Sequence, residues 1–193
     1  MNKEQREKDF KELESRAVYC LSHPEELEPI DRQLRAIYRL WHYPSLGDYK
    51  SWLVFLPLRD SESTELTIAR KVTWKREIDS RRFINPSIGL QMGFHTKPSL
   101  EILDVFINLK DLNEQLEKLD NIQISVSPIS KIIGLNGEMY GFQDLNPLQE
   151  ISLEWWSNGP REWAGLISWA AEMRDFLEIQ FQDHDNPAEE CSF

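Results

Sequence analysis

The chain has 193 residues, of which 40% are apolar and seven are tryptophan, which is enough to bury one hydrophobic core and excludes an intrinsically disordered protein. Its net charge of −11 is unevenly spread: residues 1–42 carry −1, residues 43–98 carry +3 and residues 99–193 carry −13. This acidic field argues against binding to nucleic acid or to an anionic membrane, and it favours a basic protein partner. The alternative interpretation is that the charge serves solubility alone.

The sequence predicts a cytoplasmic location. Uncharged runs such as residues 51–58 are too short to cross a bilayer, and the charged N-terminal stretch lacks the apolar segment of a signal peptide. The two cysteines, Cys20 and Cys191, do not make the disulfide framework of a small secreted protein.

Two amphipathic helices are predicted at the N-terminus. Apolar residues recur at spacings of three and four over residues 2–21 and again over residues 24–41. Pro24 suits the first turn of the second helix, because a backbone N–H has no helical partner there in any case. The short turn between the two segments predicts an antiparallel helical pair. Its apolar stripe either packs into the core or pairs two copies of the chain, so a homodimer through these helices is one prediction.

After the helical pair, the apolar period shortens to that of a strand. Residues 52–58 are almost continuously apolar and residues 66–74 alternate, which predicts a β-hairpin. Residues 100–107 predict a further strand. Asn108 suits the cap of the helix that follows, and residues 122–126 return to the alternation of a strand.

The last third of the chain carries the strongest local signals. An Asn-Gly pair at 136–137 predicts a two-residue hairpin turn within residues 131–142, because both turn positions need positive φ. Residues 151–156 alternate as a strand, and Pro160 begins a helix whose apolar stripe ends at Phe181. We predict a three-stranded antiparallel meander covered by this helix.

These elements define an α+β fold with an N-terminal helical pair, a mainly antiparallel sheet built from hairpins, and a long C-terminal helix packed on the sheet. The predicted domains are an N-terminal helical arm over residues 1–47, an α+β domain over residues 48–181 and a flexible acidic tail over residues 182–193.

One basic segment, residues 70–82, interrupts the acidic chain. It holds six cations around a tryptophan, and Arg or Lys at the end of a strand can bind phosphate or carboxylate. The alternative interpretation is that these cations pair with the acidic half of the chain or lie in water. The candidate ligand-binding residues of the basic segment are Arg70, Trp74, Lys75, Arg76, Arg81 and Arg82.

A second candidate surface lies in the acidic half. Glu154 and Trp156 alternate onto one face of a predicted strand, and Glu162 follows in the first turn of the last helix. A carboxylate beside a tryptophan could be a general acid in a cleft, or it could stand on the solvent face of a sheet. We interpret these three residues as candidates for contact with a protein partner.

The local patterns of common active sites are missing from the sequence. There is no glycine-rich phosphate loop, no Cys-x-x-Cys, no His-Glu-x-x-His and no Gly-x-Ser-x-Gly. Cys20, His23 and His42 offer three metal ligands, whereas a structural zinc site uses about four. We therefore predict no catalytic residue, no metal and no cofactor.

Four short motifs follow one another in the second half of the chain. They are Thr-Trp-Lys-Arg at 73–76 with Asp79, Asn-Gly-Glu-Met-Tyr at 136–140, Ser-Leu-Glu-Trp-Trp at 152–156, and Gly-Pro-Arg-Glu-Trp at 159–163. This order resembles a group of uncharacterised bacterial α+β proteins, over about residues 50–180. The resemblance implies no activity. Asn136 stands where that group more often has Asp, which speaks against a catalytic carboxylate at this position.

Two functions are compatible with these features. The first is a non-catalytic cytoplasmic binding protein whose acidic, tryptophan-bearing surface contacts a protein partner, as immunity and antitoxin proteins do. The second is a small-ligand or anion-binding enzyme that uses the basic segment around Trp74. A deep pocket lined by Arg70, Arg76 and a carboxylate would favour the second.

Overall fold

The computed structural model describes residues 3–30, 34–57, 67–84, 97–125, 137–148 and 151–185. Within these ranges the helices are α1 (Lys3–Ser22), α2 (Arg76–Ile84), α4 (Leu109–Asp120) and α5 (Ala164–Asp185), with short 3₁₀ helices η1 (Pro24–Glu26) and η2 (Arg161–Trp163). The strands are β1 (Leu34–Pro44), β2 (Tyr49–Pro57), β3 (Thr67–Trp74), β4 (Leu100–Ile107), β5 (Glu138–Asp144) and β6 (Ile151–Trp156).

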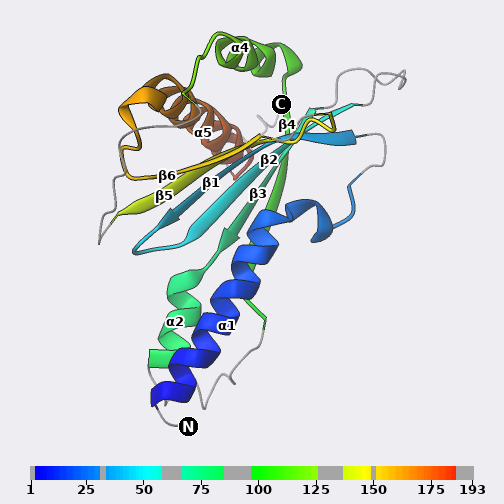
Figure 1. Cartoon of the computed structure of the whole chain (residues 1–193). Helices are drawn as coiled ribbons and strands as arrows, with labels where there is room; N and C mark the ends of the chain where they lie inside the picture. Colours follow the sequence, from blue (N-terminus) through cyan, green and yellow to red (C-terminus); the bar gives the residue numbers. More distant parts are fainter. Residues whose placement is uncertain are drawn as a thin grey trace, which may run out of the picture.

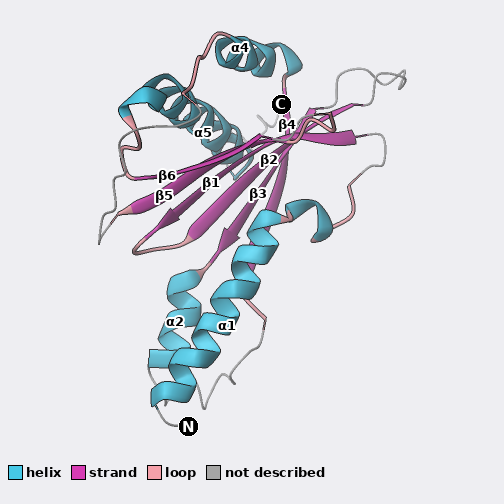
Figure 2. Cartoon of the chain, viewed as in Figure 1, coloured by secondary structure: helices cyan, strands magenta, loops and turns pink. Residues whose placement is uncertain are grey.

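A six-stranded antiparallel sheet in the order β4-β3-β2-β1-β5-β6 forms the centre of the molecule (Figure 1). Helix α1, with α2 beside it, covers one face, and α4 and α5 lie on the other (Figure 2). We call these the α1 face and the α5 face. The α+β class and the long C-terminal helix predicted from the sequence are confirmed.

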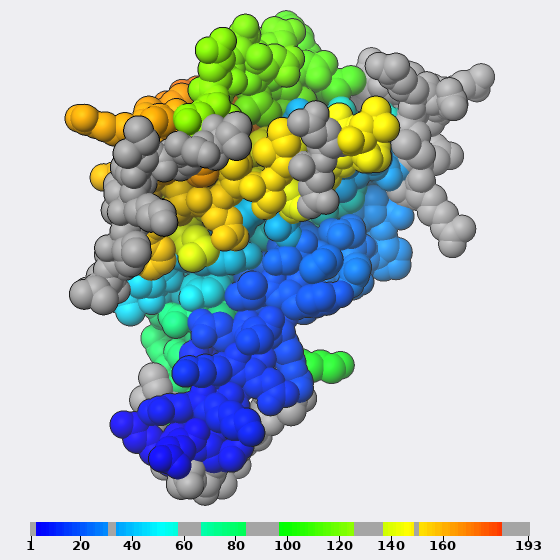
Figure 3. Space-filling view, in the orientation of Figure 1, coloured from blue at the N-terminus to red at the C-terminus, as the bar shows by residue number. Residues whose placement is uncertain are grey.

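On the α1 face, one side of α1 packs against β3. Ala17 and Leu21 of the helix are fully buried against Val72 and Trp74 of the strand. The N-terminal end of α1 extends past the sheet, alongside α2 (Figure 3). The first predicted helix is thus confirmed, and its apolar stripe packs within the chain. A homodimer through the N-terminal helices stays a prediction.

On the α5 face, the apolar stripe of α5 lies across the sheet. Met173 and Leu177 are fully buried in the same cluster as Trp52 and Val54 of β2. Helix α4 adds Leu112 to this cluster, and the side chain of Asn108 caps α4 by accepting a hydrogen bond from the N–H of Lys110 at 2.8 Å. The predicted helices after residues 108 and 160 are confirmed.

The second predicted helix is wrong, because residues 34–44 form β1 at the centre of the sheet, between β2 and β5. A central strand is buried on both faces, so neighbouring residues such as Leu40 and Trp41 are both in the core. An irregularity between Ala36 and Tyr38 also shifts the alternation and buries Ile37. The buried positions therefore fall at spacings of three and four, which resembles the period of a helix.

Strands β2, β3, β4 and β6 lie where the sequence predicts strands, and the β2–β3 hairpin is confirmed. The predicted three-stranded meander is wrong in its first strand. Strand β5 pairs with β6 on one edge and with β1 on the other, where the prediction puts residues 131–135. Residues 126–136, including Asn136, lie outside the described residues.

Residues 122–125 do not form the predicted strand. Their apolar side chains, Ile122 and Ile124, instead pack against the core cluster on the α5 face after the end of α4. The alternation of apolar residues that predicted a strand therefore belongs to an irregular segment in which every second side chain contacts the core.

The predicted domain boundary after residue 47 falls in the turn between β1 and β2, which pair with each other along most of their length. At the other end, α5 continues to Asp185, past the predicted start of a tail at residue 182. Residues 186–193 lie outside the described residues.

Candidate functional site

Arg70, the first residue of the basic segment, is fully buried on the α1 face. Its Nε and Nη2 donate to the two carboxylate oxygens of Asp104 on β4, at 2.8 and 2.7 Å. Its Nη1 donates to the carbonyl oxygens of Pro24 and Glu28, at 3.0 and 2.8 Å. The guanidinium therefore ties the segment after α1 to the sheet, with every nitrogen engaged.

Trp74 is also fully buried, and its indole N–H donates to Asp79 of α2 at 2.7 Å. Asp79, itself fully buried, accepts further hydrogen bonds from the N–H and the hydroxyl of Ser99, at 2.8 and 2.7 Å, and pairs with Arg82 at 3.1 Å. This carboxylate therefore fixes the junction between β3, α2 and the start of β4.

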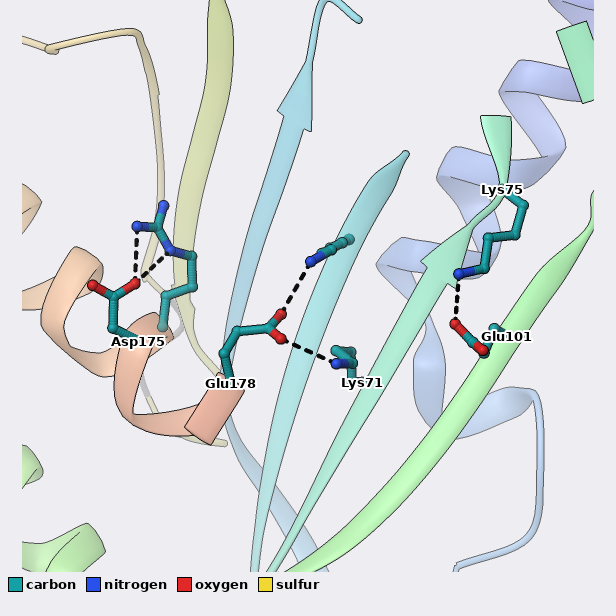
Figure 4. A network of polar contacts seen from close by, with 7 residues as sticks. Lys71, Lys75, Glu101, Asp175 and Glu178 are labelled. Atoms are coloured by element: carbon teal, nitrogen blue, oxygen red, sulfur yellow. Dashed lines mark hydrogen bonds and ion pairs between the residues drawn. The ribbon is translucent and has the colours of Figure 1, made fainter. Parts of the chain in front are cut away.

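The other cations of the basic segment pair closer to the surface. Lys75 meets Glu101 at 2.7 Å, Arg76 meets Glu14 at 3.4 Å and Arg81 meets Glu77 at 3.4 Å. Figure 4 shows the first of these pairs. The six candidate residues are thus spread over β3, α2 and the residue between them, Lys75, and each contacts a group of the chain. Their ligand-binding role stays a prediction.

The three candidate partner-binding residues lie at one edge of the sheet. Glu154 is exposed and Trp156 half-buried on the α1 face of edge strand β6, and Glu162 is exposed in η2. Gly137 lies so close to the Trp156 ring that a Cβ would overlap it. The structure brings Glu154 and Trp156 together as the alternation predicts, and their role in partner binding stays a prediction.

A cavity of about 260 Å³ lies on the α5 face, between α5 and strands β1, β5 and β6. Four aromatic residues, Trp41, Trp52, Tyr140 and Trp155, line it. Ala170 and Ala171 line it from the helix, and their small side chains leave the space that larger residues would fill. We call this space the aromatic cavity.

One residue of the cavity wall holds a buried donor. Trp52 is only 1% exposed, and its indole N–H has no hydrogen-bond partner among the described residues. The nitrogen is itself fully buried, so Trp52 contributes to the wall mainly through its apolar ring.

The mouth of the aromatic cavity is polar. Ser157 and Asn158 of the turn after β6 line it together with Arg174 of α5, and Asn158 is exposed. Ser157 has φ = 50°, a left-handed conformation that is uncommon for a residue with a side chain. The next left-handed residue, Gly159 at φ = 62°, has no room for a Cβ beside Trp155 and Ile167. This tight turn sets the polar rim.

A hydrogen-bonded trio fixes the Tyr140 wall of the cavity. The Tyr140 hydroxyl donates to Glu138, which also bonds His42 Nε2 at 3.0 Å, and the His42 ring stacks on the Tyr140 ring at 4.5 Å. Burial lowers the pKa of His42, although Glu138 opposes this, while the Tyr140 hydrogen bond lowers the pKa of Glu138. Burial, and then Glu138, raises the pKa of Tyr140. These directions favour a neutral His42 that donates from Nε2 to an ionised Glu138.

A second charged cluster closes the same face beside α5. Glu178 of the helix bridges Lys50 of β2 and Lys71 of β3, at 3.3 and 3.1 Å (Figure 4). Burial alone would raise the pKa of Glu178, but the two lysines hold it below its ordinary value. Lys71 also lies 4.6 Å from the centre of the Phe181 ring. The bridge pins the C-terminal half of α5 to the sheet, whereas the aromatic cavity lies under its N-terminal half.

Among the described residues, no group of three or more His, Cys, Asp or Glu side chains could hold a metal ion. Burial raises the pKa of the Cys20 thiol. No described helix has the length and apolar character needed to span a membrane.

Comparison with known proteins does not place the chain in a family: no family model, no curated protein and no solved structure matches it. The resemblance to a group of bacterial proteins therefore stays a prediction.

Sequence reasoning missed the aromatic cavity. Its residues come from four strands, a turn and a helix, and no local motif joins them. One signal was present: the small pair at 170–171 breaks the bulky apolar stripe of α5.

Proposed function

We propose that the protein binds a small molecule in the aromatic cavity. Ligand sites are commonly concave and apolar, with a few polar groups that fix orientation. The observation that carries the proposal is the space itself, about 260 Å³ lined by four aromatic residues and bordered by a polar rim.

The proposal is tested with indole as a neutral aromatic probe. The indole N–H of each tryptophan gives its own signal in a ¹H–¹⁵N spectrum, and Trp52→Phe identifies the signal of Trp52. We expect indole to shift the Trp52 signal in a saturable way. The proposal is wrong if the signal stays unmoved at millimolar probe, since the cavity would then hold only water.

A matched pair of variants locates the binding. Ala171→Leu fills the cavity and is expected to abolish the shift, whereas Ala164→Leu adds the same volume at an exposed position of α5 outside the lining. Equal effects of the two variants would place the probe elsewhere and contradict the proposal.

A second candidate function is contact with a basic protein partner through the acidic surface, in the manner of an immunity or antitoxin protein, without catalysis. It is supported by α4, which exposes Asp111, Glu114, Glu117 and Asp120 against two lysines. Long-range attraction from such a surface speeds association with a cationic partner.

This candidate is tested by reversing charge on α4. Asp111, Glu114 and Glu117 are changed to Lys in one variant, and the exposed Glu4, Glu7 and Glu12 of α1 in a control. A stoichiometric partner recovered by the parent protein and by the control, but not by the α4 variant, would support the proposal. Recovery by all three proteins, or by none, would count against it.

A further inference from the structure

We infer that the ligand of the aromatic cavity is a planar aromatic carboxylate of one or two rings. This inference rests on the proposed function and names the chemical class that the site selects. It follows from the volume of the cavity, the nature of its walls and the charge at its mouth.

The volume suits a ligand body of one or two rings. An apolar cavity of about 150 Å³ accommodates benzene. The aromatic cavity, at about 260 Å³, has room for a fused pair of rings or for one ring with a short substituent. A nucleotide, with a base, a sugar and a phosphate, would extend beyond this space.

The walls favour a flat and apolar ligand body. The rings of Tyr140 and Trp155 lie within 15° of parallel, with centroids 6.3 Å apart, and Trp155 is only 6% exposed. Ile167 and Ala170 add aliphatic surface from the helix. Stacked or edge-on contacts with such rings add to the free energy of burying an aromatic group.

The mouth favours a negative charge. Arg174 is the one charged residue among the described residues that line the cavity, and its guanidinium lies 5.9 Å from the centre of the Tyr140 ring. The nearby carboxylate of Glu138 does not line the cavity, and it interacts with Tyr140, His42 and Arg174. The charged side chain that a ligand contacts among the described lining residues is therefore the positive one, Arg174.

Arg174 pairs with the neighbouring Asp175, and its charge also helps to lower the pKa of Glu138 and opposes the increase in the pKa of Tyr140. Its Nε and Nη2 both reach one oxygen of Asp175, at 3.2 and 3.0 Å, and the side chains are 27% exposed for Arg174 and 68% for Asp175. An ion pair with such an exposed carboxylate contributes little to stability, so a ligand can replace Asp175. A ligand carboxylate at the mouth can accept hydrogen bonds from the Arg174 guanidinium with both of its oxygens, whereas Asp175 uses only one.

The test compares benzoate with benzamide, which have nearly the same shape but differ in charge. Dissociation constants are measured by titration of the Trp52 N–H signal at neutral pH and about 0.1 M salt, where long-range attraction is partly screened. We expect benzoate to bind at least about tenfold more tightly than benzamide. Equal affinities would overturn the inference.

Two arginine variants assign the preference to Arg174. Arg174→Gln should weaken benzoate about tenfold and leave benzamide nearly unchanged. Arg161→Gln, which removes an exposed charge in η2 outside the lining, should leave both constants within about twofold. If Arg174→Gln weakens both probes alike, or if Arg161→Gln has the same effect, the inference is wrong.

The outcomes separate this inference from the proposed function. If the protein binds indole but neither benzoate nor benzamide, or prefers benzamide, the cavity is a ligand site of another chemical class. If indole also fails to bind, the proposed function and the inference fail together.

Discussion

The two faces of the central sheet each bury a tryptophan, with opposite results. Trp74 on the α1 face is fully buried and donates its N–H to Asp79, whereas Trp52 on the α5 face is equally buried, lines a cavity, and has no hydrogen-bond partner for its N–H among the described residues. On the α1 face, Arg70 bonds Asp104 and two backbone carbonyls, and Asp79 accepts from Trp74 and Ser99, so these buried polar groups are satisfied. The comparison teaches that burial alone does not distinguish a structural tryptophan from one that lines a candidate site.

The largest expected effect comes from breaking the buried polar contacts of the α1 face. Asp104→Ala leaves the buried guanidinium of Arg70 without its carboxylate and should lower the free energy of unfolding by about 3 kcal/mol. Glu101→Ala, on the same strand, removes the partner of the half-exposed Lys75 and should cost at most about 1 kcal/mol. Urea unfolding measures both. Equal losses would mean that Arg70 contributes no more than a surface pair.

A somewhat smaller effect is expected where one residue serves both faces. Gly141 lines the aromatic cavity on the α5 face, and on the α1 face its missing Cβ leaves room for the Trp41 ring. Gly141→Ala should destabilise the protein by about 1–3 kcal/mol, because the Cβ would overlap that ring. Gly165→Ala meets only ordinary contacts in α5 and should be neutral or slightly stabilising. A tolerated Gly141→Ala would show that Trp41 is loosely held.

An alanine-to-leucine substitution on each face of the sheet tests whether the two faces are packed equally tightly. Ala17→Leu forces a larger side chain against Val72 and Trp74 and should cost about 1–3 kcal/mol. Ala171→Leu extends into the aromatic cavity and should change stability by no more than about 0.5 kcal/mol. Thermal unfolding compares the two variants. If Ala171→Leu costs as much as Ala17→Leu, the space beneath α5 is not available to a ligand.

The smallest effect concerns pH on the α5 face. Because the folded-state pKa of His42 lies below its ordinary value of 6.5, the unfolded chain takes up a proton that the folded chain does not as pH falls below 6.5. Stability should therefore decrease on acidification from about pH 7 to 5.5, by less than about 1.4 kcal/mol per pH unit. His42→Gln should flatten this dependence in urea unfolding. An unchanged slope would assign it to other groups.

The sequence was informative where one face of an element is buried. The stripe of α5 and the alternation in β6 each have a single buried side, so the pattern has one interpretation. It failed at β1, where Leu40 and Trp41 are buried on opposite faces and a local irregularity buries Ile37 as well. The pattern of buried residues in β1 depends on its central position in the sheet. That position depends on pairing with β5, which lies far along the chain.

The aromatic cavity lay beyond sequence reasoning for a related reason. Trp52 and Trp74 are both strand tryptophans, and nothing local tells which N–H finds an acceptor. The acceptor of Trp74 is only five residues away, in the turn of α2, whereas the surroundings of Trp52 are set by β5, β6 and α5. The cations of the basic segment are adjacent in sequence, but most of their partners, such as Asp104 for Arg70 and Glu14 for Arg76, are far along the chain and could not be read from it.

The place of β1 in the sheet has a consequence for synthesis. Its neighbours are β2, which follows at once, and β5, which emerges from the ribosome only after β3, α2, β4 and α4. Until then the nascent sheet ends at β1, with an unpaired backbone edge and with Leu40 lacking its cover from α5. Open edges of this kind recruit other chains, so the half-made protein should be a substrate for chaperones and a source of aggregates at high expression.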